Sequence, residues 1–418
     1  MRAKKRRSAD GPGDETAAKV AELLATARDA LGLSVTFLSR MDGETQHLEV
    51  VDTSIPLLFR EGYTQRQELT LCQAVLDGKL PEVIPDLREH PEAMKLPAAK
   101  FPRLRSYVSV PVRLSDGSLY GTFCGAGLTT DRGLSKRDKA LMDVLARAAA
   151  VVIEPEIAER ERRSEVEGRL APVLVDGGPR IVLQPIVEIA TGRRVGAEAL
   201  SRFPSEWGMT PDVVFAQAHS VGSGHRLELL ALRAAARTLD VVDGYVSMNA
   251  SPSTLLVPEC LALLGDLPLE RLLLELSEHD PVDDYDELLS AIAPLRERGM
   301  RLAIDDVGAG FSSLRHIVLT SPDVLKLDRS IVDKVSTDPV LGTLIRSLVE
   351  FAAGCSATVV AEGVETAQDA ARLHELGVPL AQGWFYGRPQ DPADLAACDL
   401  AGRDGMLPEQ RAPLTPIG

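Results

Sequence analysis

The sequence predicts an α/β protein in which a (β/α)8 TIM-like barrel follows a smaller α+β domain. Three observations carry this expectation. The chain has 418 residues, enough for two to three domains. Its C-terminal half alternates short apolar runs with helical stretches, as a barrel does. Its N-terminal third combines helices, short strands and a hairpin. Hydrophobic residues make up 45% and charged residues 26%, which is typical of a soluble globular protein.

The α+β domain is expected to span residues 15–154. Apolar side chains recur at helical spacing from Glu15 to Leu31, and Gly32 should end this helix. The further elements expected are strands at residues 34–39, 46–51 and 82–84, a helical segment at 72–77, and a hairpin with strands at 107–113 and 119–124.

A connecting segment follows this domain. A helix is expected at residues 135–153, with Pro155 interrupting it and a charged linker at 155–169. The apolar seam of this helix, Leu141 to Val152, allows two interpretations. It forms a coiled coil between two copies of the chain, or it packs on its own domain. Residues 1–14 and 401–418 are expected to be disordered tails.

The barrel is expected to span residues 170–400. Helical runs lie between its strands, for example at 227–239 and 341–353. The eight strands expected are residues 181–187, 194–200, 245–250, 272–276, 301–305, 324–327, 358–361 and 380–383.

The net charge and the spacing of the cysteines indicate which partners and which cellular location to expect. The net charge of −15 should repel nucleic acid, so no nucleic-acid partner is expected. No stretch approaches the ~18 apolar residues of a membrane span, and no apolar run follows the basic start. The five cysteines are widely spaced and form no Cys-x-x-Cys pair, so a cytoplasmic location is expected.

Polar or acidic residues end nearly every expected barrel strand, at the face where barrel active sites lie. So many oxygen ligands would repel one another unless cations sat among them, and carboxylate-rich sites suit Mg²⁺ or Mn²⁺. Any one of them alone would more often be a helix cap or a solvated loop residue. The residues are Glu198, Asn249, Glu275, Glu278, Asp305, Asp306, Lys326, Glu362, Glu365 and Gln382.

The N-terminal domain resembles a GAF domain. The resemblance rests on LRSYVSVPVRLSDGSLYGTFCG (residues 104–125) and, more weakly, on LCQAVLDGKLPEVIPDL (residues 71–87). It implies a sensor domain that often dimerises, with a ligand that the family does not specify. Cys72 and Cys124 are expected to be core residues. Neither is followed by the His usual beside bilin attachment sites, so a bilin is not expected.

The barrel resembles the EAL domains, bacterial phosphodiesterases that linearise cyclic di-GMP. Six motifs in order carry the resemblance over about residues 170–394: GAEALSR (196–202), LELSE (274–278), AIDDVGAGFSSL (303–314), LKLDRS (325–330), VAEGVE (360–365) and AQGWFYGRP (381–389).

The resemblance implies a two-metal site and a role for each of its residues. One Mg²⁺ or Mn²⁺ would be held by Glu198, Asn249, Glu275 and Asp305, and a second by Asp305, Asp306 and Glu362. Lys326 would orient the attacking water. Glu278 and Glu365 would brace the metal ligands and the loop after the fifth strand. The residues that contact the substrate would be Gln184, Leu200, Arg202, Asp328 and Gln382.

Several positions depart from the family pattern. Val307, Ala309 and Phe311 replace a common Phe, Thr and Tyr in the loop after Asp306, and His219 replaces a common Glu. These changes bear on rate and regulation more than on metal binding. The interpretation is therefore a cytoplasmic, homodimeric GAF-EAL phosphodiesterase that converts cyclic di-GMP to linear pGpG. Its alternatives are a catalytically silent cyclic di-GMP receptor and a hydrolase of another phosphodiester.

Overall fold

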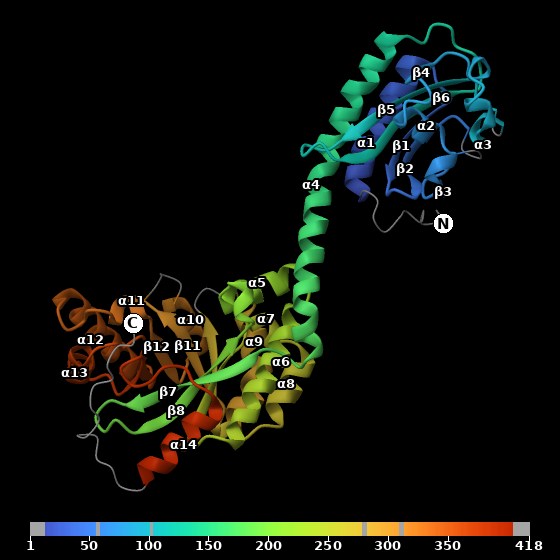
Figure 1. The fold of residues 1–418 in the computed structure, drawn as a ribbon. Helices are drawn as coiled ribbons and strands as arrows, with labels where there is room; N and C mark the ends of the chain where they lie inside the picture. The colour runs from blue at the N-terminus through green and yellow to red at the C-terminus, as the bar shows by residue number, and fades with distance from the viewer. Residues whose placement is uncertain (1–12, 56–58, 101–102, 278–281, 309–312, 404–418) are drawn as a thin grey trace. The chain divides into compact units, whose positions relative to one another are not determined.

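The computed structural model describes residues 13–55, 59–100, 103–277, 282–308 and 313–403. These residues form two compact units, one ending at Ser164 and the other beginning at Glu165. The N-terminal unit is an α+β domain, and the second is a closed eight-stranded barrel (Figure 1). Both predicted fold classes are therefore confirmed.

The N-terminal unit is built on a six-stranded sheet in the order β3-β2-β1-β6-β5-β4. The longest predicted elements are present, and Gly32 ends the first helix in the left-handed conformation, φ 62°. The elements are α1 (Asp14–Leu31), β1 (Val35–Met41), β2 (Thr45–Thr53), β3 (Thr64–Arg66), α2 (Leu71–Leu76), β4 (Val83–Ile84), α3 (Pro97–Lys100), β5 (Ser106–Arg113), β6 (Leu119–Gly127) and α4 (Lys136–Val175).

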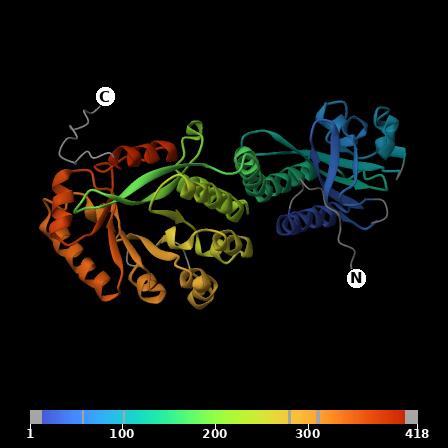
Figure 2. The same ribbon diagram turned by 90° about the horizontal axis from the view of Figure 1, so that it is seen from below.

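Alternation along the strands divides the core of this unit between the two faces of the sheet. Leu38 and Phe123 point to the face that α1 and α4 cover. Phe37 and Cys124, their neighbours in sequence, point to the opposite face, where α2 packs. Figure 2 shows the sheet with α1 and α4 beside it.

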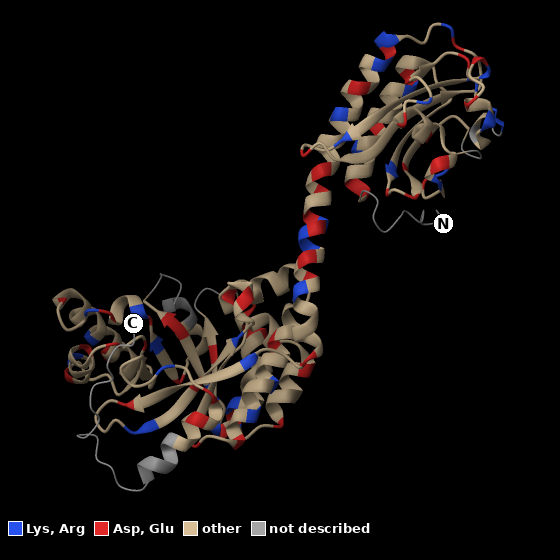
Figure 3. Ribbon diagram, in the orientation of Figure 1, with Lys and Arg blue, Asp and Glu red and all other residues tan. Residues whose placement is uncertain are grey.

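The helix α4 is continuous through Pro155, so the expectation that Pro155 interrupts it is wrong. Proline removes one backbone hydrogen bond and costs a helix interior ~3 kcal/mol. Tertiary packing on both sides offsets this cost, because Ile153 is buried in the N-terminal unit and Leu170 in the barrel unit. Charges of both signs line the segment after Pro155 (Figure 3).

The barrel closes in the order β10-β11-β12-β13-β14-β7-β8-β9. It departs from a regular (β/α)8 barrel in its first strand, since β7 is antiparallel to both β8 and β14. The turn at residues 189–193 is too short for the crossover that parallel strands need, so it makes a hairpin. The strands are β7 (Arg180–Glu188), β8 (Arg194–Arg202), β9 (Tyr245–Asn249), β10 (Leu272–Ser277), β11 (Arg301–Val307), β12 (Val324–Leu327), β13 (Thr358–Ala361) and β14 (Leu380–Gln382).

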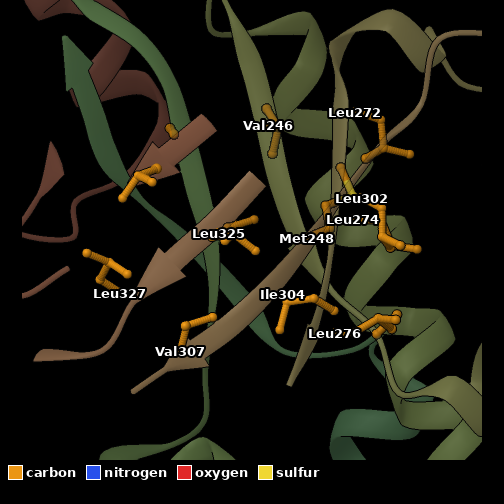
Figure 4. Close-up of a cluster of buried hydrophobic side chains, with 14 of the residues drawn as sticks. Val246, Met248, Leu272, Leu274, Leu276, Leu302, Ile304, Val307, Leu325 and Leu327 are labelled. Atoms are coloured by element: carbon orange, nitrogen blue, oxygen red, sulfur yellow. The ribbon is translucent and has the colours of Figure 1, made fainter. Parts of the chain in front are cut away.

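The main core of the barrel lies between its strands and the surrounding helices. Figure 4 shows part of it, where Met248, Leu274, Ile304 and Leu325 pack on neighbouring strands. The helices are α5 (Pro211–Ser220), α6 (Gly224–Ala236), α7 (Pro252–Leu255), α8 (Pro258–Gly265), α9 (Tyr285–Glu297), α10 (Ser313–Thr320), α11 (Arg329–Val332), α12 (Pro339–Gly354), α13 (Ala367–Glu375) and α14 (Pro392–Arg403). Within the described ranges, none of the helices has both the length and the apolar character needed to cross a membrane.

Replacing Pro155 by alanine tests the continuity of α4. We expect Pro155→Ala to stabilise the protein by about 1–2 kcal/mol, because the helix regains a hydrogen bond while the unfolded chain gains some entropy. Urea denaturation followed by circular dichroism at 222 nm measures this difference. Pro211→Ala is the matched control, since Pro211 lies in the first turn of α5, where the missing N–H costs nothing. A Pro155→Ala protein no more stable than this control would contradict a continuous α4.

Candidate active site

The predicted acids meet around one lysine. Lys326 lies on β12 and is fully buried. Its Nζ is 2.7 Å from Glu362 Oε1 and 2.9 Å from Glu275 Oε1. It is also 3.2 Å from Asp305 Oδ1 and 3.6 Å from Glu198 Oε2. These four carboxylates come from β8, β10, β11 and the residue after β13, so the barrel brings together strand ends that are far apart in sequence.

The pairing register of the strands brings these side chains together. Glu275 is paired with Asn249 of β9, and Ser277 with Asp305 of β11. Side chains two residues apart on a strand share a face. Ser247 therefore faces the same way as Asn249, and its hydroxyl donates a hydrogen bond to Glu275. Sequence reasoning missed Ser247, although its spacing from Asn249 could have identified it.

Burial and the neighbouring charges both shift the pKa values of the residues in this cluster. Burial alone would lower the pKa of Lys326, but the surrounding carboxylates outweigh it and raise that pKa well above its ordinary value. Burial raises the pKa of Glu275 well above its ordinary value, although Lys326 opposes the change. Burial and the neighbouring acids likewise raise the pKa of Glu362 to about 8. The cluster therefore holds more acid than one ammonium group can neutralise.

The donor set fits metal ions. Two groups of acids have ligand oxygens within 4.8 Å of one another, Glu198 with Glu275 and Asp305, and Asp305 with Asp306 and Glu362. Among the described residues, Glu275 Oε2 and Gln382 Oε1 are buried and have no hydrogen-bond partner. Buried oxygens without donors are costly unless a cation or water meets them. Oxygen-rich sites of this kind suit hard divalent cations.

The backbone at Asp306 is left-handed, with φ 59°. Non-glycine residues adopt this conformation at a cost, although aspartate tolerates it better than most. The backbone N–H of Asp306 donates to Asp305 Oδ1 at 3.0 Å, which holds the first carboxylate in place. Asp305 and Asp306 both offer an oxygen to the ligand group that includes Glu362, and Asp305 also belongs to the group with Glu198 and Glu275.

Two glutamines connect the cluster to β7. Gln382 Nε2 donates to Glu198 Oε2 at 2.5 Å and to Gln184 Oε1 at 3.1 Å. Asn249 Nδ2 donates to Glu198 Oε1 at 3.3 Å. Both Gln382 and Asn249 therefore orient Glu198.

Four other predicted site residues lie in the described structure but outside the cluster around Lys326, and a fifth lies outside the described residues. Arg202 lines a cavity of about 690 Å³ together with Arg180, Trp384 and Arg388. Asp328 caps α11 through the N–H of Ser330. The remaining predicted residues are Glu365, which pairs with Arg329 at 2.8 Å, Leu200, which is half-buried on β8, and Glu278, which lies outside the described residues.

A buried glutamate behind β9 was also missed by sequence reasoning. Glu228 on α6 accepts hydrogen bonds from the N–H of Ser251 at 2.9 Å and from its hydroxyl at 2.8 Å. It also pairs with His219 at 2.5 Å. Glu228 thereby fixes the turn that follows Asn249. No local pattern in the sequence distinguishes it from an ordinary helical glutamate.

Comparison with known proteins agrees with this architecture. The EAL domain model matches residues 171–389, more than half of the chain, and the GAF domain model matches residues 14–153. The probable cyclic di-GMP phosphodiesterase PdeB of Escherichia coli is 32% identical over 218 residues, which are 49% of this chain and 41% of PdeB. The cyclic di-GMP phosphodiesterase PdeL of E. coli is 28% identical over 224 residues, 50% of this chain and 61% of PdeL.

The chain spans about two fifths of the length of the first curated relatives that it matches. Among solved structures, the EAL enzyme Bd1971 with cAMP and cyclic di-GMP bound has a TM-score of 0.52 at 20% identity, covering 87% of this chain and 93% of that one. That likeness concerns the fold alone. The predicted order of the two domains is confirmed, and the chain belongs to the EAL domain family, with a GAF domain preceding its EAL domain.

Proposed function

We propose that this chain is a metal-dependent phosphodiesterase that hydrolyses cyclic di-GMP to linear pGpG under the control of its GAF domain. The observation that carries the proposal is the ring of carboxylates around the buried Lys326 at the strand ends of the barrel. The names of the E. coli relatives, both cyclic di-GMP phosphodiesterases, support the choice of substrate.

The metals proposed are two Mg²⁺ or Mn²⁺ ions per site. Glu198, Asn249, Glu275 and Asp305 would hold one, and Asp305, Asp306 and Glu362 the other. When bound, the pair would stabilise the attacking and leaving oxygens of an in-line displacement and lower the pKa of a water. In that reaction the water oxygen bonds to phosphorus, one bond from phosphorus to a 3′-oxygen breaks, and the 3′-oxygen takes up a proton.

The remaining residues would position the reactants. Lys326 would orient the attacking water as a fixed cation that cannot compete with the metals for ligands. Arg202 would bind a phosphate through its paired N–H groups. The other proposed substrate contacts are Gln184, Leu200, Asp328 and Gln382, and Glu278 and Glu365 would brace the site.

A catalytically silent receptor is the competing function. It would bind cyclic di-GMP and signal to a partner without turnover. All the acids that the resemblance implies as ligands are present in this chain, which favours the enzyme. Incubation of the purified protein with cyclic di-GMP and Mn²⁺, followed by chromatography of the nucleotides, decides between them. Binding without pGpG would establish the receptor, while hydrolysis of other phosphodiesters at equal rates would broaden the substrate class.

Asp305→Asn tests the shared ligand. We expect turnover of cyclic di-GMP to fall by roughly a hundredfold or more, because one change weakens both metal groups. Initial rates at saturating Mn²⁺ measure this loss, and substrate binding by calorimetry should persist. Asp333→Asn, an exposed acid after α11, is the control and should retain full activity. Near wild-type turnover in Asp305→Asn would refute the two-metal assignment.

Lys326→Met tests the positioning of water. The variant keeps most of the length of the side chain and removes its charge, so kcat should fall at least about a hundredfold while Mn²⁺ still binds. Rate measurements and calorimetry with Mn²⁺ give the two quantities separately. Lys334→Met, at an exposed lysine, should change neither. Loss of Mn²⁺ binding in Lys326→Met would show that the lysine is structural.

A homodimer is also proposed, with α4 as its contact. Most of the predicted seam packs on its own domain, since Leu145 is buried there. A second stripe remains open, with Val144 57% and Val151 70% exposed. Together with Leu141 and Ala148, these valines follow the 3-4-3 spacing of a coiled coil. The wide spacing of the cysteines supports a cytoplasmic location, and the GAF ligand stays unassigned.

Light scattering tests the dimer. The wild-type chain should have the mass of two copies, and Val144→Glu combined with Val151→Glu should give one copy, since the charges cannot be buried against a second helix. Val175→Glu, at an exposed valine that ends the same helix, should remain dimeric. A monomeric wild type, or a dimeric double variant, would contradict α4 as the contact.

A further inference from the structure

The core of the GAF domain contains a polar cluster that the proposed phosphodiesterase reaction does not use. Two thiols lie at its centre, Cys72 on α2 and Cys124 on β6, on the face of the sheet away from α1 and α4. Both are buried, as the sequence predicts. Their sulfur atoms are 3.5 Å apart, although the two residues are separated by 52 positions along the chain.

Polar side chains surround these sulfurs, where a core would ordinarily be apolar. The hydroxyl of Tyr107 lies 2.9 Å from Cys72 Sγ and 3.4 Å from Cys124 Sγ. The hydroxyl of Ser109 lies 3.2 Å from Cys124 Sγ, and Thr122 accepts a hydrogen bond from it at 3.1 Å.

The orientation of Gln46 makes Cys72 an acceptor. Gln65 donates to Gln46 Oε1 at 2.8 Å, so the Gln46 amide NH₂ faces the cluster. That NH₂ donates to Cys72 Sγ at 2.8 Å. The Tyr107 hydroxyl lies within hydrogen-bond distance of the same sulfur. A polar surrounding that contains an N–H donor favours a thiolate, since a thiolate only accepts hydrogen bonds.

The two thiols differ in acidity. Burial alone would raise the pKa of Cys72, but hydrogen bonds from Cys124, Tyr107, Thr122 and Gln46 outweigh it and lower the pKa to about 7. Burial raises the pKa of Cys124 well above its ordinary value, and the neighbouring Cys72 raises it further. One thiol is therefore ready to attack and the other keeps its proton, as a nucleophilic and a resolving cysteine do.

We propose that Cys72 and Cys124 form a redox-active pair that a hydroperoxide converts to a disulfide. The Cys72 thiolate attacks an oxygen of the hydroperoxide, so that a sulfur–oxygen bond forms, the oxygen–oxygen bond breaks and the leaving oxide takes up a proton. The Cys124 sulfur then attacks the sulfenic acid, the disulfide forms and the hydroxyl leaves as water with the Cys124 proton. Two thiols lose two electrons in total, and one hydroperoxide is reduced to water and an alcohol, or to two waters in the case of hydrogen peroxide.

The conversion requires a local movement. The sulfur atoms must approach from 3.5 Å to ~2.05 Å. Since α2 is a single helix of six residues and β6 is paired on both sides, α2 is the element free to shift. The same short helix covers the thiols, so its local opening would admit a small oxidant.

The test uses the full chain carrying Cys355→Ser, which removes an exposed thiol and leaves four of the five cysteines. After treatment with hydrogen peroxide, the unfolded protein should show two alkylatable thiols in place of four. Peptide mass spectrometry should find Cys72 linked to Cys124, and dithiothreitol should restore all four thiols. Adding Cys124→Ser should stop the reaction at a sulfenic acid on Cys72, trapped by dimedone, and adding Cys72→Ser should abolish both products.

Tyr107→Phe separates the proposed chemistry from mere proximity. Removing one hydrogen bond to the thiolate should slow peroxide oxidation of Cys72 at pH 7 about fivefold. Four alkylatable thiols after peroxide treatment, or a disulfide that involves Cys260 or Cys398, would overturn the proposal. So would a stoichiometric soft metal in the purified protein that Cys72→Ser removes, because the pair would then be a metal site. None of these outcomes depends on the phosphodiesterase assignment.

Discussion

The barrel mouth depends on the balance between one buried ammonium group and the carboxylates around it. Taking Lys326 and its partners out of water costs several kcal/mol for each ion, and only their mutual attraction and further cations can offset that cost. Burial raises the pKa values of Glu275 and Glu362 despite the opposing effect of Lys326. Two groups of these acids have oxygens close enough together to hold a metal ion.

Sequence reasoning could identify the residues that meet at the barrel mouth because a barrel brings strands that are far apart in sequence side by side. Glu198, Glu275, Asp305 and Lys326 interrupt apolar strand segments, and parallel pairing of β8 to β12 brings such positions to one face. Local patterns could not predict contacts made by side chains from outside the strands. Glu228 reaches the turn after Asn249 from a helix, and its role follows only from the packing of α6.

One expectation about regular structure was wrong, because local propensity predicted a break at Pro155. In α4, packing on both sides of Pro155 outweighs the lost hydrogen bond. After β7, the short segment at residues 189–193 leaves no room for the crossover of a regular (β/α)8 unit, so β7 and β8 form a hairpin. Of the predicted substrate contacts, Arg202 lies beside a cavity rather than among the acids.

The antiparallel strand β7 affects when the barrel closes during folding. Because β14 pairs with β7, the ring closes only when two segments almost 200 residues apart in the chain meet, and Gln390 then bridges to Leu183. Contacts of such long range form slowly and late. Gln382 lies on that closing strand and holds Glu198 in place. The hydrogen bond from Gln382 to Glu198 therefore forms only when the ring closes, so the arrangement of acids at the barrel mouth is completed at a late stage of folding.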